Sequence, residues 1–227
     1  MNWNPTWICP ANDLGDPAAV FGTSFVFEKK ITHANLTITA MGVYEAKLNG
    51  RRVGQFVMAP GWTSYHKRLQ YQKYDITDLL TNGKNEIEVT VGKGWYRSPL
   101  PGWLGCAYQD ELRSRPCGLA AQITLTFEDG SSKILSTDES WKVSDGPVRF
   151  SEIYDGEIYD SAKTPLLDQP VTIFDGPTDT LILQQGEEVC EQERLAVKKV
   201  FVTPNGETVL DFGQNMTGYV ELFVNAK

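Results

Sequence analysis

The sequence predicts an all-β fold, made of one β-sandwich and the beginning of a second β-domain. An extended run at 43–48 leads into Asn49-Gly50, the strongest short-range hairpin signal, because positive φ is available to both residues. Residues 85–91 alternate strictly between polar and apolar side chains, as a half-buried strand requires. No long segment of the 227 residues has the 3.6-residue period of an amphipathic helix.

Two strands are expected before this hairpin. A turn cluster of Asp, Gly and Pro at 12–17 precedes an alternating run at 21–27. A second run at 34–40 turns Leu36 and Ile38 to one face.

After the hairpin the chain continues with strands and one helical turn. The return strand is expected near Arg52, and the next extended run covers 69–74. Asp75 or Thr77 can cap a short helical turn that ends at Asn82-Gly83, before the alternating run at 85–91. Two later pairs of runs predict further hairpins, at 119–127 with 133–136 and at 195–203 with 207–212.

Composition and charge exclude several classes of protein. Apolar residues make up 41% of the chain and aromatic residues 11%, which is ample for a folded core. The net charge is −8 and the Lys and Arg residues are dispersed, so neither a nucleic acid nor a membrane surface is expected as a partner. The N-terminal stretch has neither a basic start nor an apolar signal core, so we expect either a cytoplasmic location or a leader that has been trimmed from this sequence.

Metal and disulfide signals are weak. The cysteines, at 9, 106, 117 and 190, lack CxxC spacing, and only two histidines are present, so no zinc site and no cofactor are expected. Cys106 and Cys117 are close enough in sequence to pair, but a cytosolic setting favours reduced thiols.

Two segments combine aromatic and cationic residues. Residues 60–68 (PGWTSYHKR) begin with a Pro-Gly turn, and residues 92–109 (GKGWYRSPLPGWLGCAYQ) hold too many glycines and prolines for a strand, which predicts a long irregular loop. Binding residues are often found on such loops, and aromatic rings suit the apolar face of a pyranose. The candidate carbohydrate-binding residues are Trp62, Tyr65, Arg68, Trp95, Tyr96, Arg97 and Trp103. Alternatively, these aromatic side chains pack over the end of the sandwich or against a neighbouring domain.

An acidic motif, SEIYDGEIYD, occupies residues 151–160. Its carboxylates do not have the spacing of an EF-hand, so hydrogen bonds to backbone amides and to Arg149 are favoured over a calcium site. We expect Asp155, Glu157 and Asp160 to have this structural role.

The order of these motifs resembles a known family. LNGRRVG at 48–54, PGWTSYHKR at 60–68, YQKYDITDLL at 71–80, NGKNEIEV at 82–89 and GKGWY at 92–96 are similar to the N-terminal β-sandwich of bacterial α-L-rhamnosidases. IYDGEIYD at 153–160 and DFGQN at 211–215 resemble two later motifs of that family. The resemblance implies a jelly-roll sandwich, similar to the galactose-binding type, for the first domain.

The resemblance also implies a domain plan. We expect a first β-sandwich over residues 1–165, a connection rich in Pro, Asp and Gly over 166–194, and the truncated start of a second β-domain over 195–227. A few strands cannot bury a sandwich core alone, so the second domain is expected to be incomplete.

No catalytic motif for acyl transfer, metal-dependent hydrolysis or nucleotide binding occurs in the sequence. In the family that the motifs resemble, the catalytic carboxylates lie in a C-terminal helical barrel, so no catalytic residue is assigned. The resemblance implies a non-catalytic accessory or carbohydrate-binding region of an inverting α-L-rhamnosidase, with a rhamnose-containing glycoside and the catalytic domains of the same parent chain as partners. A purely structural sandwich that braces the barrel or an oligomer interface, and a free-standing carbohydrate-binding module, remain the alternatives.

Overall fold

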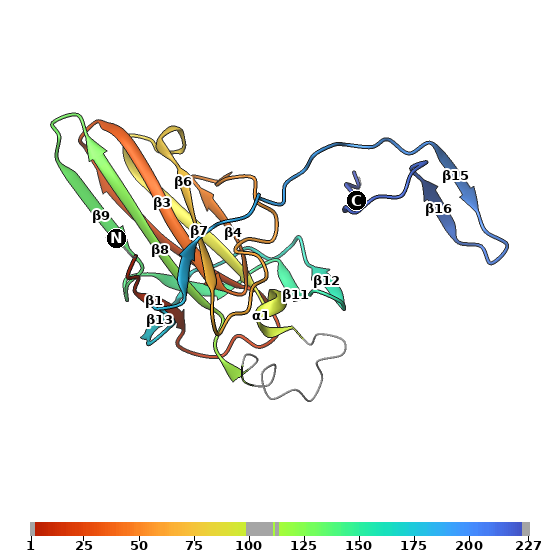
Figure 1. Ribbon diagram of the computed structural model, residues 1–227, viewed down its shortest axis with the longest axis horizontal. Helices are drawn as coiled ribbons and strands as arrows, with labels where there is room; N and C mark the ends of the chain where they lie inside the picture. The colour runs from red at the N-terminus through yellow and green to blue at the C-terminus, as the bar shows by residue number, and fades with distance from the viewer. Residues whose placement is uncertain (1–2, 99–110, 112–113, 224–227) are drawn as a thin grey trace. The chain divides into compact units, whose positions relative to one another are not determined.

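The computed structural model describes residues 3–98, 111 and 114–223. The chain divides into two units, Met1–Cys190 and Glu191–Lys227, which are considered separately. Figure 1 shows the strands of the first unit stacked in layers, with α1 (Gly94–Arg97) at one end of the sandwich. Among the described residues, no helix is both long and apolar enough to span a membrane.

Two sheet layers form the first unit. One contains β6 (Leu69–Asp75), β3 (Ile31–Met41), β8 (Gly118–Phe127), β9 (Ser132–Ser136) and β1 (Trp7–Pro10). The other contains β10 (Lys142–Asp145), β2 (Ala19–Phe27), β7 (Gly83–Gly92), β4 (Val43–Leu48) and β5 (Arg51–Arg52). The prediction of an all-β fold is confirmed.

The strand β13 (Gln169–Phe174) connects the layers. Its later residues pair with β1, in the register Trp7↔Phe174 to Pro10↔Val171. Its first two residues pair with β10 in the other layer. A strand that changes sheets in this way closes one side of a sandwich.

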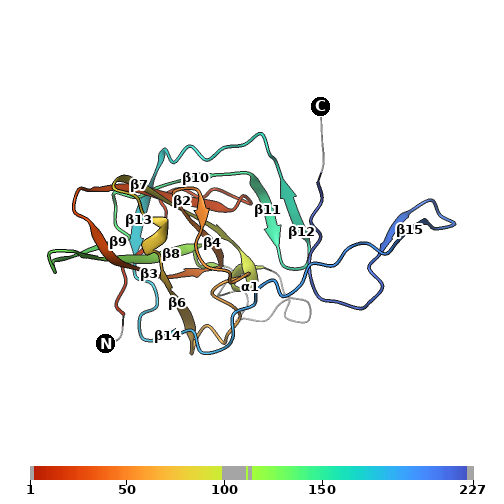
Figure 2. The same ribbon diagram turned by 90° about the horizontal axis from the view of Figure 1, so that it is seen from above.

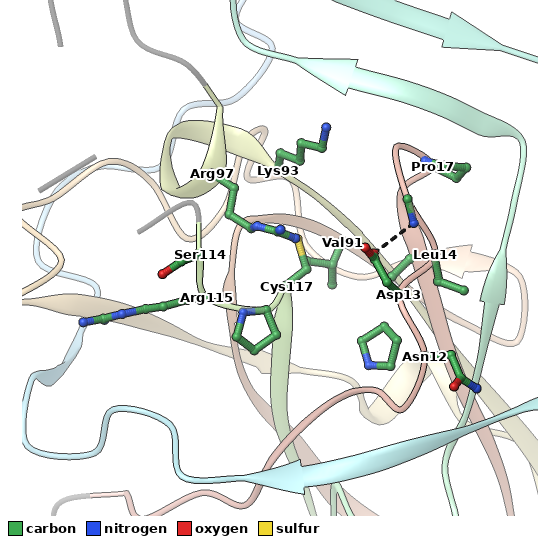
Figure 3. Close-up of a pocket in the computed structure, with 14 residues that line it drawn as sticks. Asn12, Asp13, Leu14, Pro17, Val91, Lys93, Arg97, Ser114, Arg115 and Cys117 are labelled. Carbon is green, nitrogen blue, oxygen red and sulfur yellow. Dashed lines mark hydrogen bonds between the residues drawn. The ribbon is translucent and has the colours of Figure 1, made fainter. Parts of the chain in front are cut away.

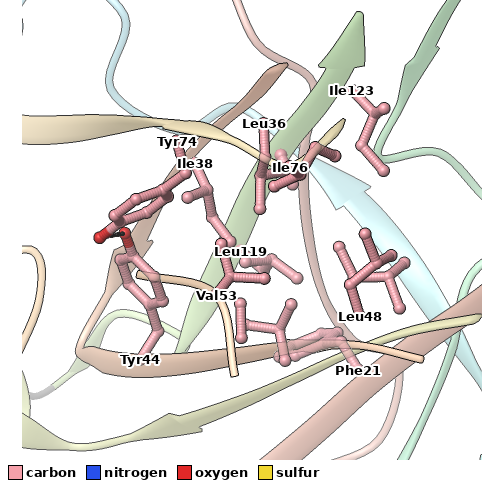
Figure 4. Close-up of a cluster of buried hydrophobic side chains, with 14 of the residues drawn as sticks. Phe21, Leu36, Ile38, Tyr44, Leu48, Val53, Tyr74, Ile76, Leu119 and Ile123 are labelled. Atoms are coloured by element: carbon pink, nitrogen blue, oxygen red, sulfur yellow. Dashed lines mark hydrogen bonds between the residues drawn. The ribbon is translucent and has the colours of Figure 1, made fainter. Parts of the chain in front are cut away.

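Alternation along the strands builds the core between the layers. β2 and β7 pair along their whole length, and β3 pairs with β8, so the inward residues of both sheets face each other. Phe21, Leu36, Ile38, Val89 and Leu125 are completely buried there. Figure 4 shows this inter-layer core, with the hydroxyl groups of Tyr44 and Tyr74 meeting at its edge.

The predicted hairpin at Asn49-Gly50 forms as expected. Asn49 has a φ of 52° and Gly50 a φ of 75°, and the turn joins β4 to β5. The Asn49 side chain also donates to the Asn85 carboxamide oxygen at 2.7 Å, which fixes the turn against the start of β7.

The predicted helical turn is the 3₁₀ helix η1 (Thr77–Leu79). Asp75 stabilises its start, because its Oδ1 accepts hydrogen bonds from the Thr77 hydroxyl at 2.6 Å and from the Thr77 amide at 2.9 Å. These bonds favour the ionised carboxylate and lower the pKa of Asp75.

The segment 166–194 differs from a simple connection. It contains β13 and also β14 (Leu181–Leu183), which pairs in parallel with β6 at the edge of its sheet. The first compact unit accordingly extends to Cys190, beyond the end at residue 165 that the sequence predicts. Prolines and aspartates surround these short strands, which is why the composition alone favours a linker.

Each of the two units also contains a smaller hairpin. β11 (Val148–Glu152) and β12 (Gly156–Tyr159) form a separate two-stranded sheet in the first unit, beside the layered strands in Figure 2. In the second unit, β15 (Lys199–Val202) pairs with β16 (Thr208–Asp211), as the sequence predicts. All four residues of β15 are exposed, so the described part of this unit encloses no core of its own.

Candidate functional site

The exposed aromatic feature nearest α1 is a pair of tryptophans. The rings of Trp62 and Trp95 are stacked, with centroids 6.1 Å apart and an interplanar angle of 7°. Trp62 is 53% exposed and Trp95 is half-buried. One face of Trp62 lies against Trp95, so its other face and its edges supply the exposed surface. We call these two residues the tryptophan pair.

Two buried tyrosines lie beneath the pair. The rings of Tyr65 and Tyr96 meet edge to face with centroids 5.1 Å apart. They are 5% and 1% exposed, within a hydrophobic cluster against which Trp95 also packs. The other buried members of this second cluster are Trp7, Met41, Leu69, Tyr71, Ala120 and Leu181. The tryptophan pair is therefore attached to a packed base.

Gly94 allows α1 to take its position. Its φ is +53°, in the left-handed region that glycine enters without strain. A Cβ at this position would lie 2.6 Å from Val43 Cγ1 and 2.9 Å from the Val43 nitrogen. Backbone bonds from Arg97 to Lys93 and from Ser98 to Gly94 then close the single helical turn that carries Trp95.

The segment that carries Trp62 is a compact turn. The Ser64 carbonyl accepts hydrogen bonds from the amides of Lys67 and Arg68, at 2.7 and 2.9 Å. The Thr63 hydroxyl donates to the Arg68 carbonyl, so the backbone beside Trp62 lies against Arg68. His66, Lys67 and Arg68 are all exposed on this turn.

A pocket of about 300 Å³, lined in part by Lys93 and by Arg97 of α1, is shown in Figure 3. The basic side chains in its lining are Lys93, Arg97 and Arg115, and Asp13 supplies a carboxylate. Figure 3 shows the Arg97 guanidinium beside the Cys117 sulfur, to which its Nη1 donates at 3.5 Å. Burial raises the pKa of the Cys117 thiol, and the neighbouring Arg97 opposes this only in part.

The charges around the pocket are engaged within the fold. Lys93 Nζ lies 2.9 Å from Glu152 Oε1 and 3.0 Å from Asp16 Oδ1. Burial disfavours the charged lysine, but these two hydrogen-bonded carboxylates outweigh it and raise the pKa of Lys93. Arg115 pairs with Glu111. The pocket is thus a region where ion pairs join separate segments, and it offers little uncompensated charge to a ligand.

Comparison with known proteins identifies the family of this chain. The family model of the α-L-rhamnosidase N-terminal domain matches residues 29–193. The chain belongs to this family. The resemblance of its motifs to α-L-rhamnosidases is thereby confirmed.

Curated and solved relatives agree with this assignment. An α-L-rhamnosidase of Streptomyces avermitilis is 36% identical over 208 residues, which cover 87% of this chain and 20% of the relative. One of Formosa agariphila is 32% identical over 225 residues, covering 94% of this chain and 23% of the relative. The chain thus spans less than a quarter of the length of these curated relatives.

Solved α-L-rhamnosidase structures share the fold. The enzyme of Aspergillus terreus superposes with a TM-score of 0.85 at 36% identity, over 94% of this chain and 26% of that chain. The enzyme of Streptomyces avermitilis, solved with L-rhamnose, superposes with a TM-score of 0.76 at 33% identity, over 88% of this chain and 20% of that chain.

The α-L-rhamnosidase N-terminal fold brings together the two segments from which the candidate binding residues come. Trp62 and Trp95 meet at the surface, and Arg68 is exposed on the same turn as Trp62. Tyr65 and Tyr96 require a correction, because they are buried and form the base of the site rather than a stacking surface. Arg97 is half-buried against Cys117, and Trp103 lies outside the described residues.

The acidic motif also departs from expectation. Arg149 donates to Asp145 and to the Gly146 carbonyl, instead of to the carboxylates of the motif. Asp155 and Glu157 are exposed on the β11–β12 hairpin. Asp160 keeps the expected kind of contact, because its Oδ1 accepts a hydrogen bond from the Ala162 amide at 3.0 Å. Over residues 3–98, 111 and 114–223, no group of three or more His, Cys, Asp or Glu side chains is arranged to hold a metal ion.

Some residues around the site carry no clear sequence signal. Lys93 lies in the GKGWY motif, but its contacts with Asp16 and Glu152 come from distant segments. Asn12 and Asp13, which line the pocket, have a composition typical of a turn. In the sequence, only the two glycines that flank Lys93, at 92 and 94, indicate an unusual backbone conformation.

Proposed function

We propose that this chain is a non-catalytic, carbohydrate-binding accessory region of an α-L-rhamnosidase whose full chain removes terminal L-rhamnose from glycosides. The observation that carries this proposal is the tryptophan pair. A large aromatic side chain that is half exposed yet held by a stacked partner is suited to ligand contact, because stability alone favours its burial.

The chemistry of the pair suits a neutral sugar. The C–H groups on one face of a pyranose are apolar and match an indole ring, while the hydroxyl groups at the edge stay free for hydrogen bonds. Because the base beneath Trp95 is packed, little side-chain freedom is lost on binding. A single surface of this kind supports a dissociation constant of about 1 mM.

The absence of catalysis is part of the proposal. An inverting glycosidase uses two carboxyl groups on either side of the scissile bond. At the tryptophan pair, the acidic side chain that the described residues place near the turn is Glu111, which pairs with Arg115 and lies 3.7 Å from His66. The catalytic carboxylates belong, on this hypothesis, to a helical domain of the parent protein.

An NMR titration tests the proposal. L-rhamnose at tens of millimolar should shift the amide and indole signals of residues 61–68 and 93–97 in the purified chain. Trp62→Ala should abolish these shifts while the melting temperature stays within about 2 °C, because the side chain is largely exposed. Ile134→Ala, an exposed apolar residue of β9 that is 61% accessible, is the matched control and should bind like the wild type.

Two outcomes would contradict the proposal. The absence of any shift with L-rhamnose, and equally with other monosaccharides, would exclude carbohydrate binding by the tryptophan pair. Turnover of an aryl α-L-rhamnoside by the purified chain would exclude a non-catalytic role.

A bracing function is the second candidate, and the β11–β12 hairpin favours it. Tyr154, Ile158 and Tyr159 on this hairpin are 58–61% exposed, which is a large apolar surface for a small sheet. Residues of this type are common where one domain packs on another. If this function holds, Ile158→Ala should weaken the thermal stability of the full-length parent protein and leave that of the present chain unchanged.

A further inference from the structure

We propose that the sugar bound at the tryptophan pair carries a carboxylate, so that the ligand class is a uronic acid or a glycan that contains one. This inference rests on the proposed carbohydrate-binding function. Its basis is the pair of exposed cations, Lys67 and Arg68, on the turn that holds Trp62.

Among the described residues, neither cation has an acidic partner. Some exposed basic residues of the first unit have carboxylate partners, as in Lys29 with Asp129 at 2.7 Å and Lys30 with Glu128 at 2.8 Å, whereas Lys133 and Lys142 have none among the described residues. Within the described part of the chain, no carboxylate lies within ion-pair distance of Lys67 or Arg68. Lys67 and Arg68 are consecutive in sequence and lie on the same turn as the exposed Trp62, in a chain whose net charge is −8.

The turn holds these cations beside the tryptophan. The Ser64 carbonyl accepts hydrogen bonds from the backbone amides of Lys67 and Arg68. The Thr63 hydroxyl donates a hydrogen bond to the Arg68 carbonyl. The backbone from Trp62 to Arg68 is therefore folded back on itself, and the bases of the three side chains belong to one small surface. His66 on the same turn is directed toward Glu111, at 3.7 Å, and is not included among the unpaired charges.

A uronic acid matches both the exposed indole of Trp62 and the two cations beside it. Its pyranose ring offers an apolar face to Trp62, while the carboxylate on C5 projects from the ring edge toward a neighbouring cation. Arginine binds a carboxylate through two parallel hydrogen bonds, and lysine adds a point charge. Exposed ion pairs each contribute modestly to affinity, so two of them should tighten binding about fivefold relative to the neutral sugar, which corresponds to about 1 kcal/mol.

Nucleic acid is the less favoured polyanion. Single-stranded binding sites align several aromatic rings along a basic groove, whereas this surface offers one exposed indole and two cations. The overall negative charge also opposes approach of a long polyanion.

Matched sugars and matched variants test the inference. The full chain is titrated by NMR at pH 7 with D-galactose and with D-galacturonate, at 20 mM and at 500 mM NaCl. Three proteins are compared with the wild type: Lys67→Gln/Arg68→Gln, Trp62→Ala, and the control Lys133→Gln/Lys142→Gln. The control removes the same charge from two exposed lysines in β9 and β10.

The expected result is a charge-dependent preference that requires Trp62. D-galacturonate should bind about fivefold more tightly than D-galactose at low salt, and the preference should disappear at high salt. Lys67→Gln/Arg68→Gln should also lose the preference but still bind D-galactose, whereas the control should keep it. Trp62→Ala should bind neither D-galactose nor D-galacturonate.

Other results overturn the inference in distinguishable ways. Equal affinity for the two sugars would reject the carboxylate and leave the carbohydrate-binding function intact. Equal losses in the control would show a general charge effect and reject the inference. Displacement of D-galacturonate by an equimolar oligothymidylate would identify a general polyanion site. Binding of neither sugar, nor of L-rhamnose, would reject the proposed function as well.

Discussion

The first unit contains two hydrophobic clusters that are built differently. The inter-layer core is made mostly of aliphatic side chains and phenylalanines on paired strands, such as Phe21, Leu36 and Ile38. The second cluster is dominated by tyrosine and tryptophan and lies below the 61–68 turn and α1. The first cluster lies between the two sheet layers, whereas the second continues through Trp95 to the exposed Trp62.

The two clusters should therefore contribute to different properties, the first to the stability of the fold and the second to ligand binding. Burial of aliphatic surface stabilises the fold by about 25 cal/mol per Å², so the inter-layer core is where the folding free energy is concentrated. The second cluster holds one aromatic ring in place at the surface. Substitutions should therefore change stability in the first cluster and ligand binding at the exposed end of the second.

The largest effect on stability is expected in the inter-layer core. Ile38 is completely buried on β3, and Ile38→Ala leaves a cavity between the layers. The free energy of unfolding should fall by about 2–5 kcal/mol in urea denaturation. Sugar binding by the folded fraction should be unchanged. A urea midpoint equal to that of the wild type would contradict this view of the core.

Gly94→Ala should affect both stability and the site. The left-handed backbone costs a non-glycine residue about 1–3 kcal/mol, and the added Cβ also meets Val43. The tryptophan pair should be disturbed as α1 shifts, which near-UV circular dichroism would detect. Gly130→Ala is the control, because Gly130 has a φ of +78° but open space around it. Equal effects of the two substitutions would exclude the contact with Val43 as the cause.

Tyr44 should make the first unit sensitive to alkali. Burial, and then the neighbouring Tyr74, raise the pKa of Tyr44 well above its ordinary value of 10.0. A raised pKa in the folded state means that its contribution to stability is complete below pH 10 and is lost as the pH rises beyond that value. The free energy of unfolding of the wild type should fall above pH 10.

Tyr44→Phe isolates this contribution. At pH 7 the variant should lose about 1–3 kcal/mol, because the Gln72 carboxamide oxygen no longer receives the tyrosine hydroxyl. Its stability should then decline less steeply above pH 10 than that of the wild type. Parallel curves of unfolding free energy against pH for the two proteins would show that Tyr44 is not the titrating group.

The smallest effect is expected in the acidic motif. Asp155 is exposed in the turn of the β11–β12 hairpin, away from both clusters. Asp155→Ala should change the free energy of unfolding by less than about 0.5 kcal/mol, measured by thermal denaturation. A clear loss of stability would restore the structural role that the sequence predicts for this carboxylate.

The fold could be predicted where residues close in sequence determine the backbone conformation. Positive φ at Asn49-Gly50 and the alternation along β7 depend on neighbours in sequence, and both predictions are confirmed. β13 begins Gln169-Pro170, and a proline there favours a loop prediction because it cannot donate to a ladder. Only its pairing with β1 and β10 shows that it is a strand.

The site was predictable by residue type but not by role. Aromatic composition identifies both the 60–68 and the 92–97 segments. Which rings are buried depends on how the two segments pack together, and Tyr65 and Tyr96 face inward because they meet each other. The ion pairs of Lys93 join three segments that are distant in sequence, so no local pattern could indicate them.

The pairing of β1 with β13 determines when the sandwich can close during synthesis. β1 cannot complete its pairing until Phe174, which lies in register with Trp7, has been synthesised, and the Trp7 indole donates to the carbonyl of the still later Pro177. Contacts of such long sequence separation form late and slowly. A nascent chain halted at residue 165 would carry β1 without its main neighbour and with the Trp7 face uncovered. The last 25 residues of the first unit, 166–190, are therefore required before β1 can pair along its whole length.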